Sequence, residues 1–200
     1  MKKELPHFNV EEAYGGSQRW CVDHWMWLGG CAAVTACDSS LYFTLHKGIG
    51  GLYPYDAQAI SKADYVRFAD VMRPYLRPRR KGVNRLPIYI EGFRRFLRER
   101  GARNLLMTPW PGRRSFRETR EIVKAQIENG WPVPCLTLRH RRAALRLYVW
   151  HWFLLNGYEE TAASFKVKAV TFGEWRWVDF RELWDTGYAQ RGGLILYDTL

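Results

Sequence analysis

The chain has 200 residues, of which 47% are hydrophobic and 16% aromatic, and its formal net charge is +11. This apolar content argues against a disordered chain and is ample for a packed core. No window approaches the roughly eighteen consecutive apolar residues of a membrane span. No apolar segment follows the basic start, so we expect no secretory signal and a cytoplasmic location.

The basic excess, 31 Lys and Arg against 20 Asp and Glu, could attract nucleic acid, anionic lipid or an acidic substrate. A solvated basic surface also accounts for it, because much of the Arg between Arg67 and Arg120 falls at the helical spacing of an outer face. Neither the glycine-aromatic signature of an RRM nor zinc-finger spacing is present. Charge alone therefore does not identify a partner.

The first part of the chain has helical periodicity. A helix is predicted from Cys31 to about Leu45, with small and apolar residues on every face, as in a buried helix. Gly29-Gly30 precedes it and Lys47-Gly48 ends it. The Arg- and Pro-rich run from Arg73 to Arg85 is predicted to be a loop. Three further helices are predicted, from the Ser61 cap to about Arg73, from Pro87 to Gly101, and from the Ser115 capping box to Asn129-Gly130.

After Trp131 the pattern is typical of strands. Apolar and polar residues alternate along Phe165–Val170, which indicates a strand with one solvent-exposed and one buried face. Helices first and an antiparallel sheet second predict the α+β class: one domain, 1–200, with a mainly helical lobe at about 1–130, a sheet lobe at about 131–200, and a cleft between them. The other predicted elements are strands at Val133–Leu138, Leu147–Asn156 with a turn at Gly157, Glu174–Val178 and Leu194–Tyr197, and a short turn through Trp184 capped by Asp179.

The four cysteines are Cys21, Cys31, Cys37 and Cys135. An even count permits two disulfides, but a cytosolic chain of this size does not need them. A zinc site drawn from Cys21, His24, Cys31 and Cys37 matches no familiar ligand spacing. We therefore expect no disulfide, metal or cofactor.

Cys31 opens the predicted buried helix. Backbone N–H groups and the helix dipole at a helix start favour a thiolate, so this position is expected to lower the pKa of the cysteine. Gly29-Gly30 would let a substrate backbone approach the sulfur closely. Buried cysteines in helices are common, so this feature gains weight only when combined with a base.

His151 is the candidate base, and Gln18 is the candidate oxyanion donor. His151 lies in an aromatic strand about 120 residues after Cys31, and elements from two lobes can place a nucleophile and its base on opposite sides of a cleft. The Gln18 side-chain amide, beside the Cys31 backbone N–H, could stabilise a tetrahedral oxyanion. Taken singly, a histidine in such a strand is more often a core residue than a catalyst, and Gln18 is better explained as a surface residue of a polar turn.

Three motifs in this order resemble the papain-like superfamily of cysteine peptidases: Gln18, Gly29-Gly30-Cys31-Ala32-Ala33 opening a helix, and His151 with Gly157-Tyr158 on a strand. The local sequence Gly-Gly-Cys-Ala-Ala-Val around Cys31 and the Trp-rich strand resemble the bacterial branch of this superfamily, near the double-glycine leader peptidases of bacteriocin export. The resemblance covers most of the chain in element order but only about twenty residues in motif. It implies a papain-like fold and a metal-free Gln–Cys–His apparatus that cleaves a peptide or amide bond.

The chain departs from that pattern at the residue that orients the imidazole. Such enzymes usually carry Asn or Asp on the strand after the histidine, where this sequence has Thr171. The Thr171 hydroxyl is one candidate orienter, and Asp179 is another if the hairpin folds back. Asn156 lies an odd number of residues from His151 and is expected on the opposite face of the strand. The spacing from Gln18 to Cys31 is longer than in papain and leaves room for an inserted turn.

Three functions follow as hypotheses. The first is a cysteine peptidase or amidohydrolase with a peptide or protein substrate, which the basic surface would bias toward acidic sequences. The second is a papain-fold protein that binds peptides without catalysis. The third is a basic nucleic-acid-binding domain built on the helices between Arg94 and Arg120. A peptide-binding groove in the second case would draw on Trp150, Trp152, Trp175 and Trp177, which packing in a core explains as well.

Overall fold

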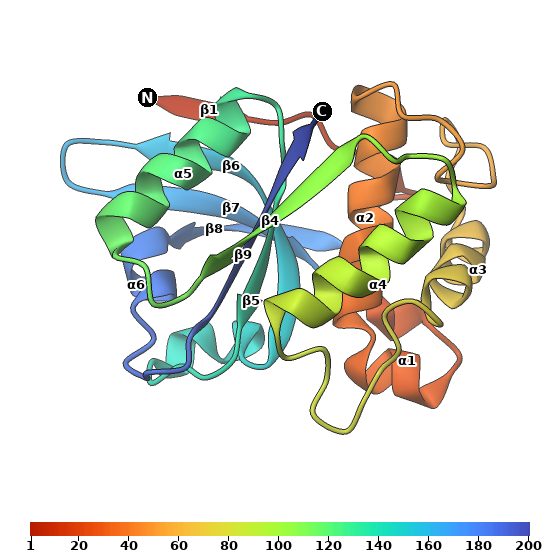
Figure 1. Cartoon of the computed structure of the whole chain (residues 1–200). Coiled ribbons are helices and arrows are strands. Elements are labelled where there is room, and N and C mark those ends of the chain that lie inside the picture. The colour runs from red at the N-terminus through yellow and green to blue at the C-terminus, as the bar shows by residue number, and fades with distance from the viewer.

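The computed structural model describes all residues, 1–200, and consists of an antiparallel sheet beside a group of helices. In Figure 1 the sheet occupies one half of the molecule, and α1 to α4 occupy the other. The α+β prediction is confirmed at this level. The helices are η1 (Gln18–Trp20), α1 (His24–Gly29), α2 (Cys31–His46), α3 (Lys62–Met72), α4 (Leu86–Glu99), α5 (Phe116–Glu128), η2 (Ala143–Tyr148) and α6 (Phe180–Trp184).

Side-chain caps begin several helices where the sequence predicts them. The Ser61 side chain accepts a hydrogen bond from the Asp64 backbone and begins α3. Ser115 and Glu118 form a reciprocal capping box at the start of α5, and Asp179 caps α6. Each cap satisfies backbone N–H groups that have no partner inside the helix. Short-range chemistry therefore sets these boundaries.

The sheet has seven strands in the order β4-β9-β5-β6-β7-β8, and β1 also pairs with β6. All of its pairings are antiparallel. A separate small ribbon is formed by β2 and β3. The strands are β1 (Lys2–Glu4), β2 (Asn9–Val10), β3 (Ala13–Tyr14), β4 (Leu105–Pro111), β5 (Val133–Thr137), β6 (His151–Glu160), β7 (Phe165–Thr171), β8 (Glu174–Asp179) and β9 (Gly192–Thr199).

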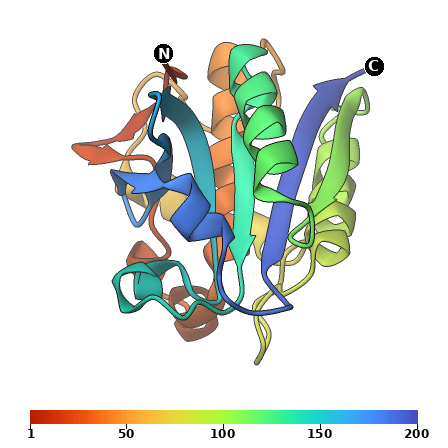
Figure 2. The same cartoon turned by 90° about the vertical axis from the view of Figure 1, so that its left-hand side faces the viewer.

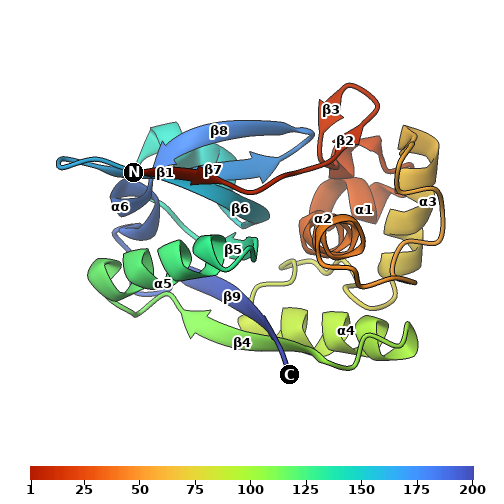
Figure 3. The same cartoon turned by 90° about the horizontal axis from the view of Figure 1, so that it is seen from above.

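The predicted boundary near residue 131 does not separate helices from strands. Strands β1 and β4 come from the first 130 residues, yet both pair within the sheet. Helix α5 precedes the boundary as well and lies along the sheet (Figures 2 and 3). Strand β4 was missed because it lacks clean alternation and contains two prolines, which an edge strand tolerates.

The strand that carries His151 differs from the prediction at both ends. Residues 143–148 form the 3₁₀ helix η2, so β6 begins at His151. Gly157 is not a turn, because β6 continues to Glu160. A Cβ on Gly157 would lie 3.0 Å from the backbone oxygen of Lys3. Glycine therefore permits the close approach of β1 at this point.

Helix α2 is the buried centre of the helical half. Thirteen of its residues, from Cys31 to Phe43, are buried, and it packs between α3 and β6. Figure 3 shows it end-on between the sheet and α3. In Figure 1 its start, α1 and the loop from α3 to α4 lie at the same end of the molecule. No helix combines the length and apolar composition needed to cross a bilayer.

Candidate active site

Cys31 is the first residue of α2 and is only 7% exposed. Helices α1 and α2 follow each other with Gly30 as the single residue between them. The Gly30 backbone N–H donates to the Met26 carbonyl at 2.8 Å, and a Cβ on Gly30 would lie 2.4 Å from that oxygen. The second glycine of the Gly-Gly pair is therefore required for the tight junction that places Cys31.

All four predicted site residues line one small internal cavity. Gln18 comes from η1, Cys31 from α2, His151 from the start of β6, and Thr171 from the end of β7. The cavity has a volume of about 10 Å³, which is close to the space of one water molecule. The nucleophile and base candidates thus line the same cavity, which is too small for a substrate. The other lining residues are Gly16, Val34, Thr35, Asp38, Trp152, Val170 and Phe172.

Thr171 is the residue that contacts the imidazole. Its Oγ1 lies 2.7 Å from His151 Nε2. Asp179 instead accepts a hydrogen bond from the Glu182 backbone at 2.9 Å and caps α6. Asn156 donates to the Tyr14 hydroxyl at 3.1 Å and does not line the cavity. Of the three side chains considered as orienters, only Thr171 reaches the ring.

Phe172 covers His151 on the outer side. The two rings stack with centroids 4.7 Å apart and an interplanar angle of 10°, and the Arg19 guanidinium lies 4.2 Å over the Phe172 ring. Phe172 and Gly173 form the two-residue turn between β7 and β8, with φ of 57° and 77°. Positive φ at both positions is typical of a type I′ hairpin, which favours Asn or Gly over Phe.

Two of the three non-glycine residues with positive φ flank His151. Trp150, with φ of 52°, precedes it in the chain, and Phe172 stacks on its ring. Such conformations are costly for bulky side chains, and they cluster at functional sites because the surrounding structure must hold them. Backbone strain therefore concentrates around the histidine.

Burial keeps both members of the pair neutral. It raises the pKa of the Cys31 thiol, although the backbone N–H groups of Trp152, Ala32 and Cys31 itself act in the opposite direction. Burial and, to a lesser extent, the nearby charge of Arg19 together lower the pKa of His151 to about 4. The expectation of a lowered cysteine pKa is therefore wrong for this closed arrangement, because desolvation outweighs the helix start.

Gln18 is buried beside the cysteine. Its Nε2 donates to the Trp27 backbone oxygen at 2.9 Å, which ties η1 to α1. An amide nitrogen carries two hydrogens, so one remains for another acceptor. The long spacing from Gln18 to Cys31 is occupied by α1, which is the extra turn that the spacing allowed.

Asp38 is a cavity residue that the sequence reasoning did not identify. It follows Cys31 by seven residues on α2, which places both on one face of the helix. Its carboxylate accepts hydrogen bonds from the Gly16 backbone at 3.1 Å and from the Tyr65 hydroxyl at 2.5 Å. Burial nevertheless raises the pKa of Asp38 to about 7. The seven-residue spacing between Cys31 and Asp38 on a predicted helix is the sequence signal that could have placed Asp38 on the same helix face as Cys31.

The remaining cysteines lack the surroundings of a nucleophile. All four cysteines are buried and unbridged. Burial raises the pKa of Cys21 to about 11, and it also raises the pKa of Cys37 and of Cys135. No three His, Cys, Asp or Glu side chains gather in a metal-binding arrangement. Cys31 is distinguished from the others by the histidine that shares its cavity.

Comparison with known proteins finds no family model, curated protein or solved structure that matches the chain.

Proposed function

We propose that the protein is a cysteine peptidase or amidohydrolase with a papain-like arrangement, in which Cys31 is the nucleophile and His151 the base. One observation carries the proposal: residues 120 positions apart in the chain, on a helix start and a strand start, share a cavity of about 10 Å³ with Gln18 and Thr171. A buried nucleophile helix beside an antiparallel sheet that carries the histidine supports the same assignment.

The first half of the reaction is acyl transfer to sulfur. In this mechanism we assign the ring hydrogen of neutral His151 to Nε2, which lies 2.7 Å from Thr171 Oγ1, so that Nδ1 takes the Cys31 proton as the sulfur attacks the carbonyl carbon. The free Gln18 amide hydrogen and the Cys31 backbone N–H stabilise the oxyanion. Collapse of the tetrahedral species breaks the C–N bond, and the His151 proton passes to the leaving amine.

The second half regenerates the enzyme. Water attacks the thioester carbonyl and gives a proton to His151 Nδ1. The C–S bond then breaks, a carboxylic acid is released, and the proton returns to the Cys31 sulfur. No metal or external oxidant is needed, because the net reaction is hydrolysis.

Catalysis by this mechanism requires the site to open. The cavity admits no more than a water molecule, and the Phe172 ring lies over His151 with Arg19 stacked upon it. Displacement of the Phe172 turn would hydrate the pair, and hydration removes the desolvation that raises the pKa of Cys31 and lowers that of His151. Opening and activation are thus one event in the proposed mechanism.

The test is selective labelling of Cys31. We expect an epoxysuccinyl probe to modify Cys31 in the intact protein, and His151→Ala to slow this labelling at least about tenfold, because the base no longer assists formation of the thiolate. Peptide mapping by mass spectrometry gives the site, and Cys135→Ser is the control that should leave the rate unchanged. Labelling of Cys31 no faster than that of the other three cysteines contradicts the proposal.

A second candidate is a protein of similar architecture that binds peptides without cleaving them. The closed cavity and the neutral Cys31 and His151 favour it over an active enzyme in the resting state. Trp150 and Trp175 are 48% and 45% exposed and are available to a ligand, whereas Trp152 is buried in the core. Tight peptide binding with no turnover of a broad peptide library would favour this candidate.

A further inference from the structure

The loop between α3 and α4, residues 73–85, lies against the candidate active site. A Cβ on Gly29, two residues before Cys31, would lie 3.8 Å from Pro78 Cβ. At its other end the loop accepts a hydrogen bond at the Val83 carbonyl from Trp152 Nε1. Trp152 lines the Cys31 cavity. The loop therefore contacts one cavity residue, Trp152, and lies near Gly29, which precedes the cavity residue Cys31 by two positions.

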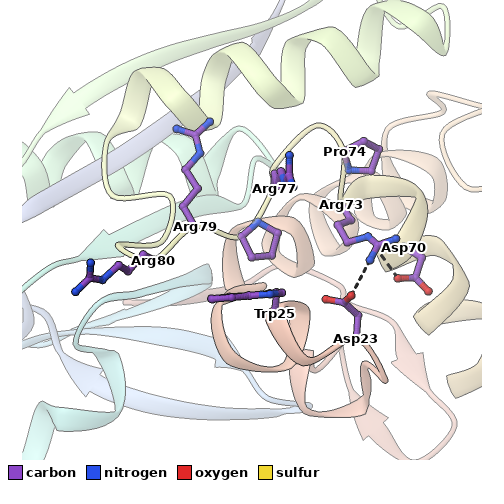
Figure 4. Close-up of a pocket in the computed structure, with 9 residues that line it drawn as sticks. Asp23, Trp25, Asp70, Arg73, Pro74, Arg77, Arg79 and Arg80 are labelled. Atoms are coloured by element: carbon purple, nitrogen blue, oxygen red, sulfur yellow. Dashed lines mark hydrogen bonds and ion pairs between the residues drawn. The ribbon is translucent and has the colours of Figure 1, made fainter.

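The loop forms one side of an open cavity of about 1130 Å³. Figure 4 shows Trp25 of α1 in this cavity, with Arg77, Arg79 and Arg80 contributed by the loop. These three arginines are exposed and form no ion pair with any carboxylate of the chain. The fourth arginine, Arg73, lies 2.8 Å from Asp23 and 4.0 Å from Asp70. Three unpaired positive charges thus lie on the loop that lines this cavity.

One exposed apolar side chain, Trp25, lines the same cavity as these arginines, and its helix exposes two others. Trp25, Trp27 and Leu28 of α1 are 54%, 50% and 57% exposed. Several large apolar side chains exposed on one short helix are unusual for a surface without a partner. Aromatic residues and arginines are also the residue types most enriched in binding hot spots. The surface is therefore suited to a ligand that carries both apolar groups and negative charges.

We propose that Trp25, Arg77, Arg79 and Arg80 form a docking surface for an acidic, apolar segment of a peptide substrate. Carboxylates of the segment pair with the loop arginines, and its apolar side chains cover Trp25. The proposal rests on the proposed function, because Pro78 of the loop lies near Gly29, two residues before Cys31. A peptide is the occupant on which the chemistry proposed at Cys31 would act, and a nucleic acid is an outcome that the experiment distinguishes.

The experiment separates docking from catalysis by using the full chain with Cys31→Ala. Binding of a fluorescein-labelled peptide of alternating Glu and Leu is measured by anisotropy at low salt, against a Gln and Leu counterpart. We expect Arg77→Gln, Arg79→Gln and Arg80→Gln together to weaken binding of the acidic peptide about tenfold or more. Trp25→Ala should weaken binding of both peptides.

The matched control removes three other exposed arginines, by Arg94→Gln, Arg98→Gln and Arg103→Gln. They line an open cavity along α4 that shares no residue with the loop surface. Binding should change less than about twofold, since the net charge falls equally but the loop is intact. Equal losses in both triple variants, or no binding of the acidic peptide, would overturn the proposal.

Two further outcomes separate the alternatives. A loop variant that loses a single-stranded oligodeoxynucleotide but retains the acidic peptide would show a nucleic-acid surface and overturn the proposal. Loop-dependent peptide binding in a protein that never labels at Cys31 would support the docking surface while removing the peptidase.

Discussion

Thr171 is the side chain on which the orientation of His151 depends. Its Oγ1 is the hydrogen-bond partner of the ring, 2.7 Å from Nε2. A hydroxyl is uncharged, so it holds the tautomer of a neutral imidazole without stabilising an imidazolium as a carboxylate does. This arrangement is compatible with the lowered pKa of His151, about 4.

Removal of the hydroxyl should affect rate more than stability. We expect Thr171→Val to lower kcat at least about tenfold with little change in KM, because the ring loses its orienting bond while the peptide contacts remain. Thr171→Ser keeps the hydroxyl and should restore most of the rate. Hydrolysis of a fluorogenic peptide gives both constants, and equal loss in the two variants would assign Thr171 to packing alone.

At the scale of elements, the junction of α1 and α2 sets the position of Cys31. Of the two adjacent glycines, Gly30 is sterically required at this junction and Gly29 is not. A Cβ on Gly30 would overlap the Met26 carbonyl oxygen at 2.4 Å, whereas one on Gly29 would meet only Pro78 at 3.8 Å. Gly30 is buried, and Gly29 is partly exposed at the last position of α1. The pair therefore offers two substitutions of identical chemistry in different surroundings.

We expect Gly30→Ala to lower the free energy of unfolding by about 2 kcal/mol or more, because the helix junction must shift to relieve the overlap. Gly29→Ala should be neutral or raise it by up to about 1 kcal/mol, since alanine favours the helix. Urea denaturation followed by circular dichroism measures both values. Similar losses in the two variants would contradict the steric assignment.

The β7–β8 hairpin is the second element that defines the site. Clean alternation in the sequence predicts its two strands, and the structure confirms them at Phe165–Thr171 and Glu174–Asp179. The alternation does not reveal that the turn residue Phe172 stacks on His151. That contact depends on how β7 registers with β6, which is a long-range property.

For the whole molecule, buried titratable groups make stability depend on pH in opposite directions. Both ring nitrogens of His7 are buried without a hydrogen-bond partner, and the ring stacks with Phe8 and with Tyr14. Burial lowers its pKa to about 3, and the charges of Lys168 and His46 act in the same direction. Burial instead raises the pKa of Asp38 to about 7.

The signs follow from proton linkage. Between pH 6.5 and about 3 the unfolded chain binds a proton at His7 that the folded chain does not, so stability is lost as the pH falls through this range. His151 acts in the same way from pH 6.5 to about 4. Asp38 binds its proton more tightly when folded, so its contribution is lost as the pH rises from 3.8 through about 7.

We expect His7→Phe to reduce the loss of stability between pH 7 and pH 4 by about 3 kcal/mol, because a stacked apolar ring takes no proton. Any packing cost of the larger ring is common to both pH values and cancels in the difference. Urea denaturation at each pH measures the effect, with exposed His24→Phe as the control. An unchanged pH dependence would mean that His7 is not the buried acid-sensitive group.

The sequence by itself determined the elements whose signals are local. The caps at Ser61, Ser115 and Asp179 and the glycines before Cys31 act within a few residues, so they can be read without knowing the fold. Local signals likewise placed Cys31 at the start of a helix and His151 in a strand. Strand β4 escaped detection because its own residues lack clean alternation and include two prolines, and its pairing with β9 is a long-range contact.

Only the tertiary structure decided the protonation of the site, the cover over it and the basic loop beside it. The pKa of Cys31 is raised because α2 is buried between α3 and β6. This burial results from packing by segments that are distant in the sequence. Phe172 reaches His151, and residues 73–85 reach Gly29 and Trp152, through contacts between residues far apart in the chain. Local patterns report short-range preferences, whereas desolvation and packing depend on which remote segments meet.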